Sequence, residues 1–315
     1  MMYPWGDERR YNSYSGYFRR IFGSRVQKLS VNVGFTCPNR DGTVGLGGCT
    51  FCRNDAFTPS YCSSTKSVQQ QLQEGIEFHR NRYRSAERYI AYFQSFSNTY
   101  ASLDVLKQLY ASVFDNPEVI GVIVGTRPDC MDEEKLDFFA ELSRHHYVSI
   151  EYGIESCYDT TLKEINRGHD YACAAHAVKM TAERGLHVGA HFILGLPGET
   201  RTMLFDQIER INALPLTTLK FHQLQIFRDT PMAALYAKSP DQFHFWTCEE
   251  YIDFVIDLVE RLRPDVVLER FASEAPPRFQ AGPTWGMIRN EQLWNRFERR
   301  LLERDTYQGK FFDQI

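Results

Sequence analysis

Short apolar runs alternate with longer helical patterns from about residue 27 to residue 226, and this alternation constrains the fold more than any other feature of the sequence. A βα series of this kind predicts an α/β fold in which helices pack against a sheet of parallel strands. The expected strands are 29–33, 89–93, 119–124, 147–152, 187–194 and 219–226, and the expected helices between them are 66–85, 103–114, 133–144, 171–184 and 202–214. Six such strands form either a partial barrel or an open doubly wound sheet, and both bind ligands at the carboxyl ends of their strands.

The regular alternation ends after residue 226. The remaining sequence predicts a helix at 249–263, a strand at 266–270, a turn at Pro276 and Pro277, and a final amphipathic helix at 291–304. No strong linker separates this part, so we expect it to pack on the barrel rather than to fold alone. The expected organisation is an N-terminal arm at 1–27, a partial barrel at 28–228 and a C-terminal α/β extension at 229–315.

Composition narrows the class of protein. The 315 residues are 43% hydrophobic with a formal net charge of -4, as in a soluble globular protein. The sequence lacks a run of about 18 apolar residues, and its first six residues are followed by charged ones, so we expect a cytoplasmic protein without a membrane partner. Eight cysteines are too few for a disulfide scaffold in a chain of this length. In a reducing compartment, clustered thiols indicate metal or redox chemistry.

Three cysteines follow the first expected strand in a C-x11-C-x2-C pattern, namely Cys37, Cys49 and Cys52. The loop between them contains glycines that permit a tight backbone around an inorganic centre, at positions Gly42, Gly45, Gly47 and Gly48. A structural zinc ion needs four ligands, and Cys62 is the candidate for the fourth. Three thiolates alone would leave one metal position open, which is typical of a reactive centre. Zinc and an iron–sulfur cluster both remain possible from the spacing.

The triplet, with Phe51 directly before its last cysteine, resembles the signature of the radical S-adenosylmethionine (SAM) superfamily. Further segments match in the same order: 14–18 (YSGYF), 125–130 (GTRPDC), 166–169 (NRGH) and 195–199 (GLPGE). The resemblance covers about residues 10–310 and is close to the YhcC-like family, which is related to the catalytic subunit of Elongator, a modifier of tRNA wobble uridines. It implies a partial (β/α)6 TIM-type barrel, a [4Fe-4S] cluster on the three cysteines, and SAM bound at the free iron.

The resemblance also suggests which residues contact SAM. Phe51 would lie beside the adenine, and Arg167 would bind the SAM carboxylate or the substrate. The segment 94–99 replaces the Gly-Gly-Glu sequence common in the superfamily, so Gln94 and Ser97 are the expected acceptors for the SAM amino group, with an ordinary polar turn as the alternative. The full expected set of cofactor contacts is Phe51, Gln94, Ser97, Thr126, Asp129, Glu151, Arg167 and Gly195.

The N-terminal 28 residues hold six basic and two acidic side chains, together with seven aromatic ones. Such a segment suits single-stranded nucleic acid, although the rings would equally suit packing on the main domain. Basic residues at 80, 82, 84 and 88 are expected on one helix, and Lys220, His222 and Gln225 on the sixth strand are candidates for the substrate cavity.

With the resemblance, these features favour a tRNA wobble-uridine side chain as the substrate and a one-electron donor such as flavodoxin or ferredoxin. The alternatives are a small metabolite or a protein as the substrate, or a noncatalytic zinc module that binds nucleic acid.

Overall fold

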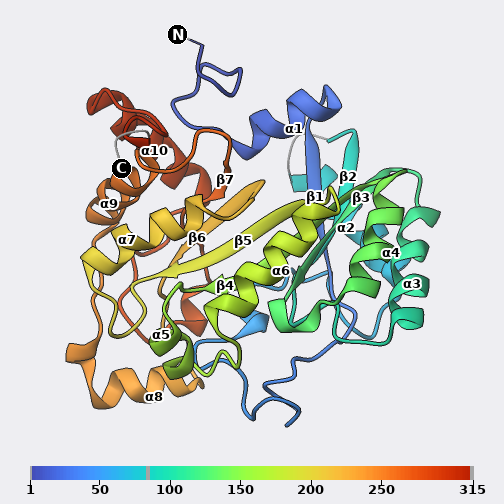
Figure 1. Cartoon of the computed structure of the whole chain (residues 1–315), viewed down its shortest axis with the longest axis horizontal. Helices are drawn as coiled ribbons and strands as arrows, with labels where there is room; N and C mark the ends of the chain where they lie inside the picture. The colour runs from blue at the N-terminus through green and yellow to red at the C-terminus, as the bar shows by residue number, and fades with distance from the viewer. Residues whose placement is uncertain (1, 83–85, 313–315) are drawn as a thin grey trace.

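The computed structural model describes residues 2–82 and 86–312, and within them seven parallel strands form one sheet in the order β1-β2-β3-β4-β5-β6-β7 (Figure 1). The strands are β1 Val26–Val31, β2 Arg88–Phe93, β3 Val119–Thr126, β4 Tyr147–Glu155, β5 His187–Leu194, β6 Thr218–Gln223 and β7 Val267–Arg270. The predicted partial barrel is confirmed. It extends by one strand beyond the six expected, because the strand of the C-terminal extension pairs in parallel with β6.

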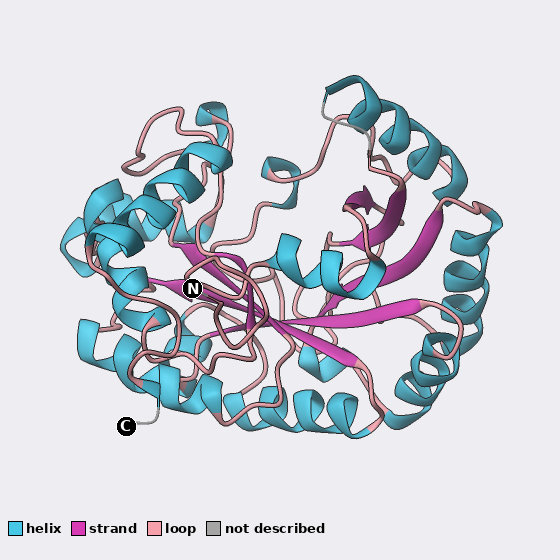
Figure 2. Ribbon diagram, turned by 90° about the horizontal axis from the view of Figure 1, so that it is seen from above, coloured by secondary structure: helices cyan, strands magenta, loops and turns pink. Residues whose placement is uncertain are grey.

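Helices form an outer layer around the curled sheet (Figure 2). The α-helices are α1 Tyr14–Phe22, α2 Val68–Arg82, α3 Leu103–Ser112, α4 Glu133–Ser143, α5 Asp159–Glu164, α6 Tyr171–Glu183, α7 Arg201–Asn212, α8 Pro231–Lys238, α9 Cys248–Val259 and α10 Asn290–Glu303. Short 3-10 helices lie at η1 Asn54–Ala56, η2 Val113–Asp115, η3 Pro128–Cys130, η4 Pro240–Gln242 and η5 Pro277–Phe279. None of the helices described is long and apolar enough to cross a membrane.

The two faces of the strands differ in chemistry, as the two-residue period of a strand requires. In β4, Val148, Ile150 and Tyr152 belong to the main apolar core that the outer helices cover. Between them, Glu151 points to the inner face and is 2% exposed. Gly189 on the neighbouring strand leaves room for it, because a Cβ at that position would lie 2.7 Å from the Glu151 side chain. The inner face is therefore polar and built to accept buried charge.

Four side chains, each at most 17% exposed, form a ring of alternating charge on this inner face, which we call the charged ring. Glu151 contacts the ammonium groups of Lys28 at 3.2 Å and of Lys220 at 2.7 Å, and Glu269 contacts the same two groups at 2.7 and 2.8 Å. Lys28 lies on β1 and Glu269 on β7, the two edge strands of the sheet. The charged ring thus links the first and last strands across the open side of the half-barrel.

The N-terminal arm packs on the domain through its aromatic rings. Tyr3 stacks on Trp5, with ring centroids 5.1 Å apart, and Tyr11 stacks on Trp294 of α10 at 5.0 Å. Phe18 of α1 is 3% exposed and belongs to a cluster on the inner side of β2–β4. In Figure 1, α1 lies at the end of the sheet opposite the loop that follows β1. The arm has the packing role that the sequence left open, and these rings are not available to stack on bases.

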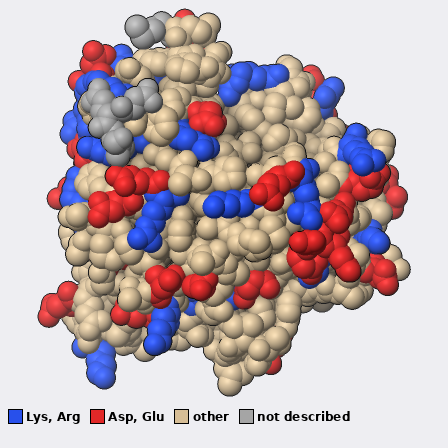
Figure 3. Space-filling model, viewed as in Figure 1, with Lys and Arg blue, Asp and Glu red and all other residues tan. Residues whose placement is uncertain are grey.

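The expected basic helix also differs from the structure. Arg80 on α2 pairs with Glu118, and Arg88 lies on β2 rather than on the helix. Position 84 lies outside the described residues. On the face seen in Figure 3, basic and acidic side chains are interspersed without a broad basic area.

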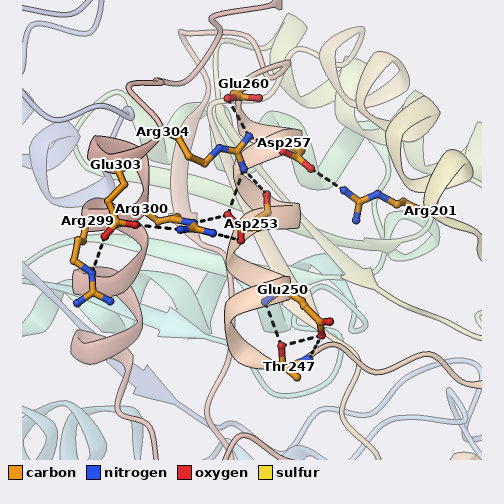
Figure 4. Close-up of polar contacts among 10 residues, drawn as sticks. All are labelled: Arg201, Thr247, Glu250, Asp253, Asp257, Glu260, Arg299, Arg300, Glu303 and Arg304. Atoms are coloured by element: carbon orange, nitrogen blue, oxygen red, sulfur yellow. Dashed lines mark hydrogen bonds and ion pairs between the residues drawn. The ribbon is translucent and has the colours of Figure 1, made fainter.

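The last two α-helices are joined by ion pairs (Figure 4). The Asp253 carboxylate on α9 accepts hydrogen bonds from Arg300 Nε at 2.7 Å and Nη2 at 2.6 Å. Asp257 lies between Arg304, at the end of α10, and Arg201 of α7, at 2.7 Å from each. The C-terminal extension is thereby fastened to the helical layer of the half-barrel. The extension begins with a short helix that was not expected, α8.

Candidate cluster and cofactor site

The three cysteines of the triplet line one cavity of about 200 Å³ at the carboxyl ends of the strands. They lie in the loop between β1 and η1, where Cys49 is buried and Cys37 and Cys52 are partly exposed. The backbone N–H of Cys52 donates to the Cys49 carbonyl at 3.1 Å, which gives the C-x2-C segment a turn. The sequence prediction that these thiols lie together at a strand end therefore agrees with the structure.

The loop is shaped by glycine and by contacts with the segment after α5. Gly48 has a φ of 78°, and a Cβ there would lie 2.7 Å from the Arg40 side chain, so this position needs glycine on both counts. Asn166 donates to the Gly48 carbonyl at 2.8 Å, and the Thr50 N–H donates to the Ile165 carbonyl at 3.0 Å. Among the expected glycines, Gly45 does not adopt a positive φ.

Two nitrogen donors lie against the buried thiol of the triplet. Asn39 Nδ2 and Arg167 Nη1 are each 3.3 Å from Cys49 Sγ. Arg167 also lies 3.9 Å from Glu155, and its side chain is 7% exposed. Burial raises the pKa of Cys37 to about 12, although Arg167 opposes the shift. The Cys37 thiol of the protein alone is therefore neutral, and a bound metal centre, which deprotonates its thiol ligands, would find the Arg167 charge already in place.

The donor set fits an iron–sulfur cluster better than a single zinc ion. Cys62, the candidate fourth zinc ligand, donates to the Ser30 carbonyl at 2.8 Å and lines a different, smaller cavity. Within residues 2–82 and 86–312, no three His, Cys, Asp or Glu side chains come close enough to hold one metal ion. In a four-iron cluster each thiolate binds its own iron, so the three sulfurs need only face one cavity. This is the arrangement of Cys37, Cys49 and Cys52.

The structure brings together five of the eight expected SAM contacts. Those that line the cavity are Phe51, Gln94, Thr126, Glu151 and Arg167. Both Glu151 carboxylate oxygens are already engaged, since one faces Lys28 and the other faces Lys220 and, at 3.1 Å, His191 Nε2. Burial alone would raise the pKa of Glu151, but Lys220 and Lys28 hold it well below its ordinary value.

The other three expected contacts do not line the cavity. The Ser97 hydroxyl contacts that of Thr126 at 2.9 Å and accepts from the Arg127 N–H at 3.2 Å, so it supports the wall from behind. The Asp129 carboxylate accepts hydrogen bonds from Arg127 Nε at 2.8 Å and Nη2 at 2.7 Å. Gly195 borders a separate hollow, where a Cβ would lie 2.8 Å from Trp246.

Several lining residues escaped the sequence interpretation, namely Arg40, Phe96, His191 and Arg270. The sequence could have predicted His191, because the two-residue period of β5 places it on the inner face with Gly189. No sequence pattern identifies the loop residues. His222 and Gln225 both reach the cavity, although they alternate along the chain, because β6 ends at Gln223 and the period ends with it.

Comparisons with known proteins cover most of the chain. The Radical SAM superfamily model matches residues 31–210, and the Radical_SAM C-terminal domain model matches residues 216–303. YtqA of Bacillus subtilis is 34% identical over 98% of this chain and 94% of its own length. YhcC of Escherichia coli K12 is 33% identical over 90% of this chain and 92% of its own.

Two more distant matches come from an archaeon, and one of them is named for an activity on tRNA. A tRNA uridine(34) acetyltransferase of Methanocaldococcus infernus is 29% identical over 27% of this chain and 15% of its own length. The solved structure of Elp3 from the same organism, lacking residues 1–46, has a TM-score of 0.69 at 14% identity, and covers 90% of this chain and 64% of that one. This likeness shows a shared fold.

The cofactors of the superfamily are a [4Fe-4S] cluster and SAM, and the cavity holds a cysteine triplet fitted to the first. The family models and the full-length relatives together cover nearly the whole chain. The chain belongs to the radical SAM superfamily.

Proposed function

We propose that the protein is a radical SAM enzyme that modifies the C5 side chain of a tRNA wobble uridine. When bound, a [4Fe-4S] cluster would supply the electron for reductive cleavage of SAM, the chemistry that would start hydrogen abstraction from the substrate. The residues proposed to hold the cluster are Cys37, Cys49 and Cys52. A donor such as flavodoxin or ferredoxin would provide the electron.

The remaining residues of the chain bind and orient. Arg167 and Asn39 donate toward Cys49 Sγ and so stabilise the thiolate form of that ligand. Phe51 offers a ring for the adenine, and Gln94 offers an amide oxygen for the SAM amino group, in place of the carboxylate common in the superfamily. Ser97, Asp129 and Gly195 would act through the residues they support rather than by direct contact.

One observation carries the choice of a polymeric substrate. The 200 Å³ cavity shares Gln223, Leu224, Gln225 and Ser273 with a second hollow of about 1110 Å³, so the two are adjacent. Trp246, Trp285 and Arg289 line the larger hollow and offer flat rings and a cation. Bases stack on such rings and phosphates pair with arginine. A reacting base in the smaller cavity with its neighbours in the larger hollow would use both spaces, and the tRNA-related name of one distant relative supports the same class of substrate.

Two observations favour a different substrate, a small metabolite or a protein. The aromatic rings of the N-terminal arm are used in packing, and the face in Figure 3 lacks a broad basic area. That alternative predicts no salt-sensitive tRNA binding, because binding through phosphates weakens steeply as salt rises.

The radical SAM activity is tested by anaerobic reconstitution with iron and sulfide, followed by measurement of 5'-deoxyadenosine formed from SAM and a reductant. Cys52→Ala should lose the iron, the brown colour and the product, whereas Cys62→Ser should retain all three. Colourless wild-type protein carrying stoichiometric zinc would overturn the assignment.

The substrate is tested separately by mass spectrometry of wobble nucleosides from a deletion strain. We expect one modified nucleoside to disappear and to return with the wild-type gene but not with Cys52→Ala. An unchanged nucleoside profile would refute the tRNA substrate and leave the radical SAM activity standing.

A further inference from the structure

The last strand of the sheet carries a β-bulge that turns two consecutive charged residues to the inner face. Leu219 on β6 pairs with Leu268, but the next residue, Lys220, pairs with Arg270, so Glu269 is the extra residue. Bulges re-aim side chains and are common beside active sites. Here Glu269 joins the charged ring, and Arg270 lines the cavity that contains the cysteine triplet. A regular strand would have placed one of the two on the outer face.

Arg270 differs from three other arginines of the cavity wall. Arg53, Arg127 and Arg167 each have a carboxylate within 4 Å, on Asp229, Asp129 and Glu155 respectively. In the part of the chain that the structure describes, the Arg270 guanidinium forms neither a hydrogen bond nor an ion pair. Burial raises the pKa of Glu274 and Arg270 opposes that shift, yet the two side chains do not pair. Its charge and its planar set of donors are therefore free to meet a ligand.

An imidazole with a free nitrogen lines the same cavity. His222 Nε2 is buried and has no hydrogen-bond partner among the described residues. Burial and then Arg270 lower the pKa of His222 well below its ordinary value, so the ring is neutral and donates through one nitrogen. Its ring centroid lies 5.6 Å from that of His191, whose Nε2 is engaged with Glu151.

The neighbouring amides are already used. Gln223 and Gln225 donate to the Ser273 carbonyl at 2.8 and 2.6 Å, and Gln223 also accepts from the Ser273 N–H at 2.9 Å. They hold the chain after β7 in place and form the border between the two hollows. The free polar groups at this end of the cavity are thus a guanidinium and an imidazole.

We propose that Arg270 and His222 form a subsite for an oxyanion of the substrate, either a phosphate ester or a carboxylate. A guanidinium offers two parallel N–H donors that match two oxygens of either group, and a neutral imidazole N–H supplies a third. The subsite lies in the smaller cavity, which also contains Gln223 and Ser273, two of the residues that border the larger hollow. This inference rests on the proposed function, because it takes its substrate from there. It adds the chemical group by which that substrate would be held.

The test uses the full chain and two monovalent probes, dimethyl phosphate for a nucleic-acid backbone and acetate for a carboxylate. Each is titrated at constant ionic strength into protein with ¹⁵N-labelled histidine, and the His222 resonance is assigned from its loss in His222→Gln. We expect a saturable shift of that resonance with at least one probe, and a weakening of its affinity by about tenfold or more in Arg270→Gln.

Arg278→Gln is the matched control, because Arg278 lies on η5 against the Phe279 ring and does not line the cavity. It should leave the titration unchanged. If Arg270→Gln fails to fold, Arg270→Lys retains the charge without the planar fork and should bind more weakly than wild type.

A stronger response to dimethyl phosphate would assign the subsite to a nucleic-acid phosphate, and a stronger response to acetate would assign it to a carboxylate substrate. The absence of a saturable shift with both probes, or equal affinities in wild type and Arg270→Gln, would overturn the proposal. If reconstituted Arg270→Gln lost as much affinity for SAM as it lost for the probe, the proposal would also be overturned, because Arg270 would then bind the cofactor. The titration needs neither cluster nor tRNA, so its failure leaves the proposed function standing.

Discussion

Replacement of Glu151 by glutamine tests whether the charged ring stabilises the half-barrel. The side chains of Glu151 and Lys220 are 2% and 3% exposed, and the Glu151 carboxylate faces Lys28, Lys220 and His191 within 3.2 Å. Glu151→Gln would leave the buried Lys220 and the partly buried Lys28 with Glu269 as their single carboxylate. Breaking a buried pair in this way costs about 3–5 kcal/mol, because the uncompensated charge stays buried. We expect the free energy of unfolding at pH 7 to fall by that amount.

Urea denaturation measures the change, and two further variants make it specific. Glu249→Gln removes an exposed carboxylate 2.8 Å from Arg296 and should cost less than about 1 kcal/mol. Adding Lys220→Met to Glu151→Gln removes one charge of each sign, so the double variant should be more stable than the sum of the two single losses predicts. Additive losses, or a loss below about 1 kcal/mol for Glu151→Gln, would refute the reasoning.

The same carboxylate predicts a dependence on pH. Its pKa in the folded protein lies well below the ordinary value of 4.5, so its contribution to stability is complete above that value. The contribution is lost as pH falls from about 4.5 through the folded pKa. Stability curves of wild type and Glu151→Gln should therefore converge in acid, and parallel curves would contradict the assignment.

Two further predictions concern the cavity loop and the turn after β5. Gly48→Ala should destabilise by roughly 1–3 kcal/mol, because its φ of 78° strains an L-residue and its Cβ would meet Arg40. Gly47 has a similar φ of 80°, and no atom lies within 4 Å of a Cβ added there, so Gly47→Ala is the control. In urea denaturation, a smaller loss of unfolding free energy in Gly47→Ala would isolate the clash with Arg40, and equal losses would exclude it. Burial raises the pKa of Glu199 to about 7 although the Ser156 hydroxyl opposes it, so the stability due to this group is lost as pH rises from about 4.5 through 7. Glu199→Gln should gain stability relative to wild type between pH 5 and pH 8, and a constant difference would contradict this.

The alternating pattern predicted a strand well where that strand is buried between two adjacent strands and under the helical layer. The prediction for β5 matches His187–Leu194, since this strand lies inside the sheet. The sixth strand was predicted to run to residue 226, but β6 ends at Gln223. Leu224 and Ile226 are buried in a second apolar cluster outside the sheet, and an apolar run does not say against which layer it will pack.

The sequence predicted the part of the site whose residues lie close together along the chain. Cys37, Cys49 and Cys52 are near in sequence, so their shared cavity followed from one loop. The partners of Glu151 come from three other strands, and Lys28 was grouped with the basic arm because nothing in the sequence distinguishes a buried lysine from a solvated one. The Glu269 bulge changes which residues face inward, and it depends on register that a single strand does not encode.

The charged ring also determines the order in which the chain gains stability during synthesis. Its members lie at positions 28, 151, 220 and 269, so a nascent chain that ends before Glu269 has two lysines and one glutamate for the interior. Burying that unbalanced set is unfavourable. The early strands can collapse as they emerge from the ribosome, but the interior reaches charge balance only when the seventh strand arrives. A ribosome stalled before that point would present an open, hydrated sheet that chaperones and proteases can reach.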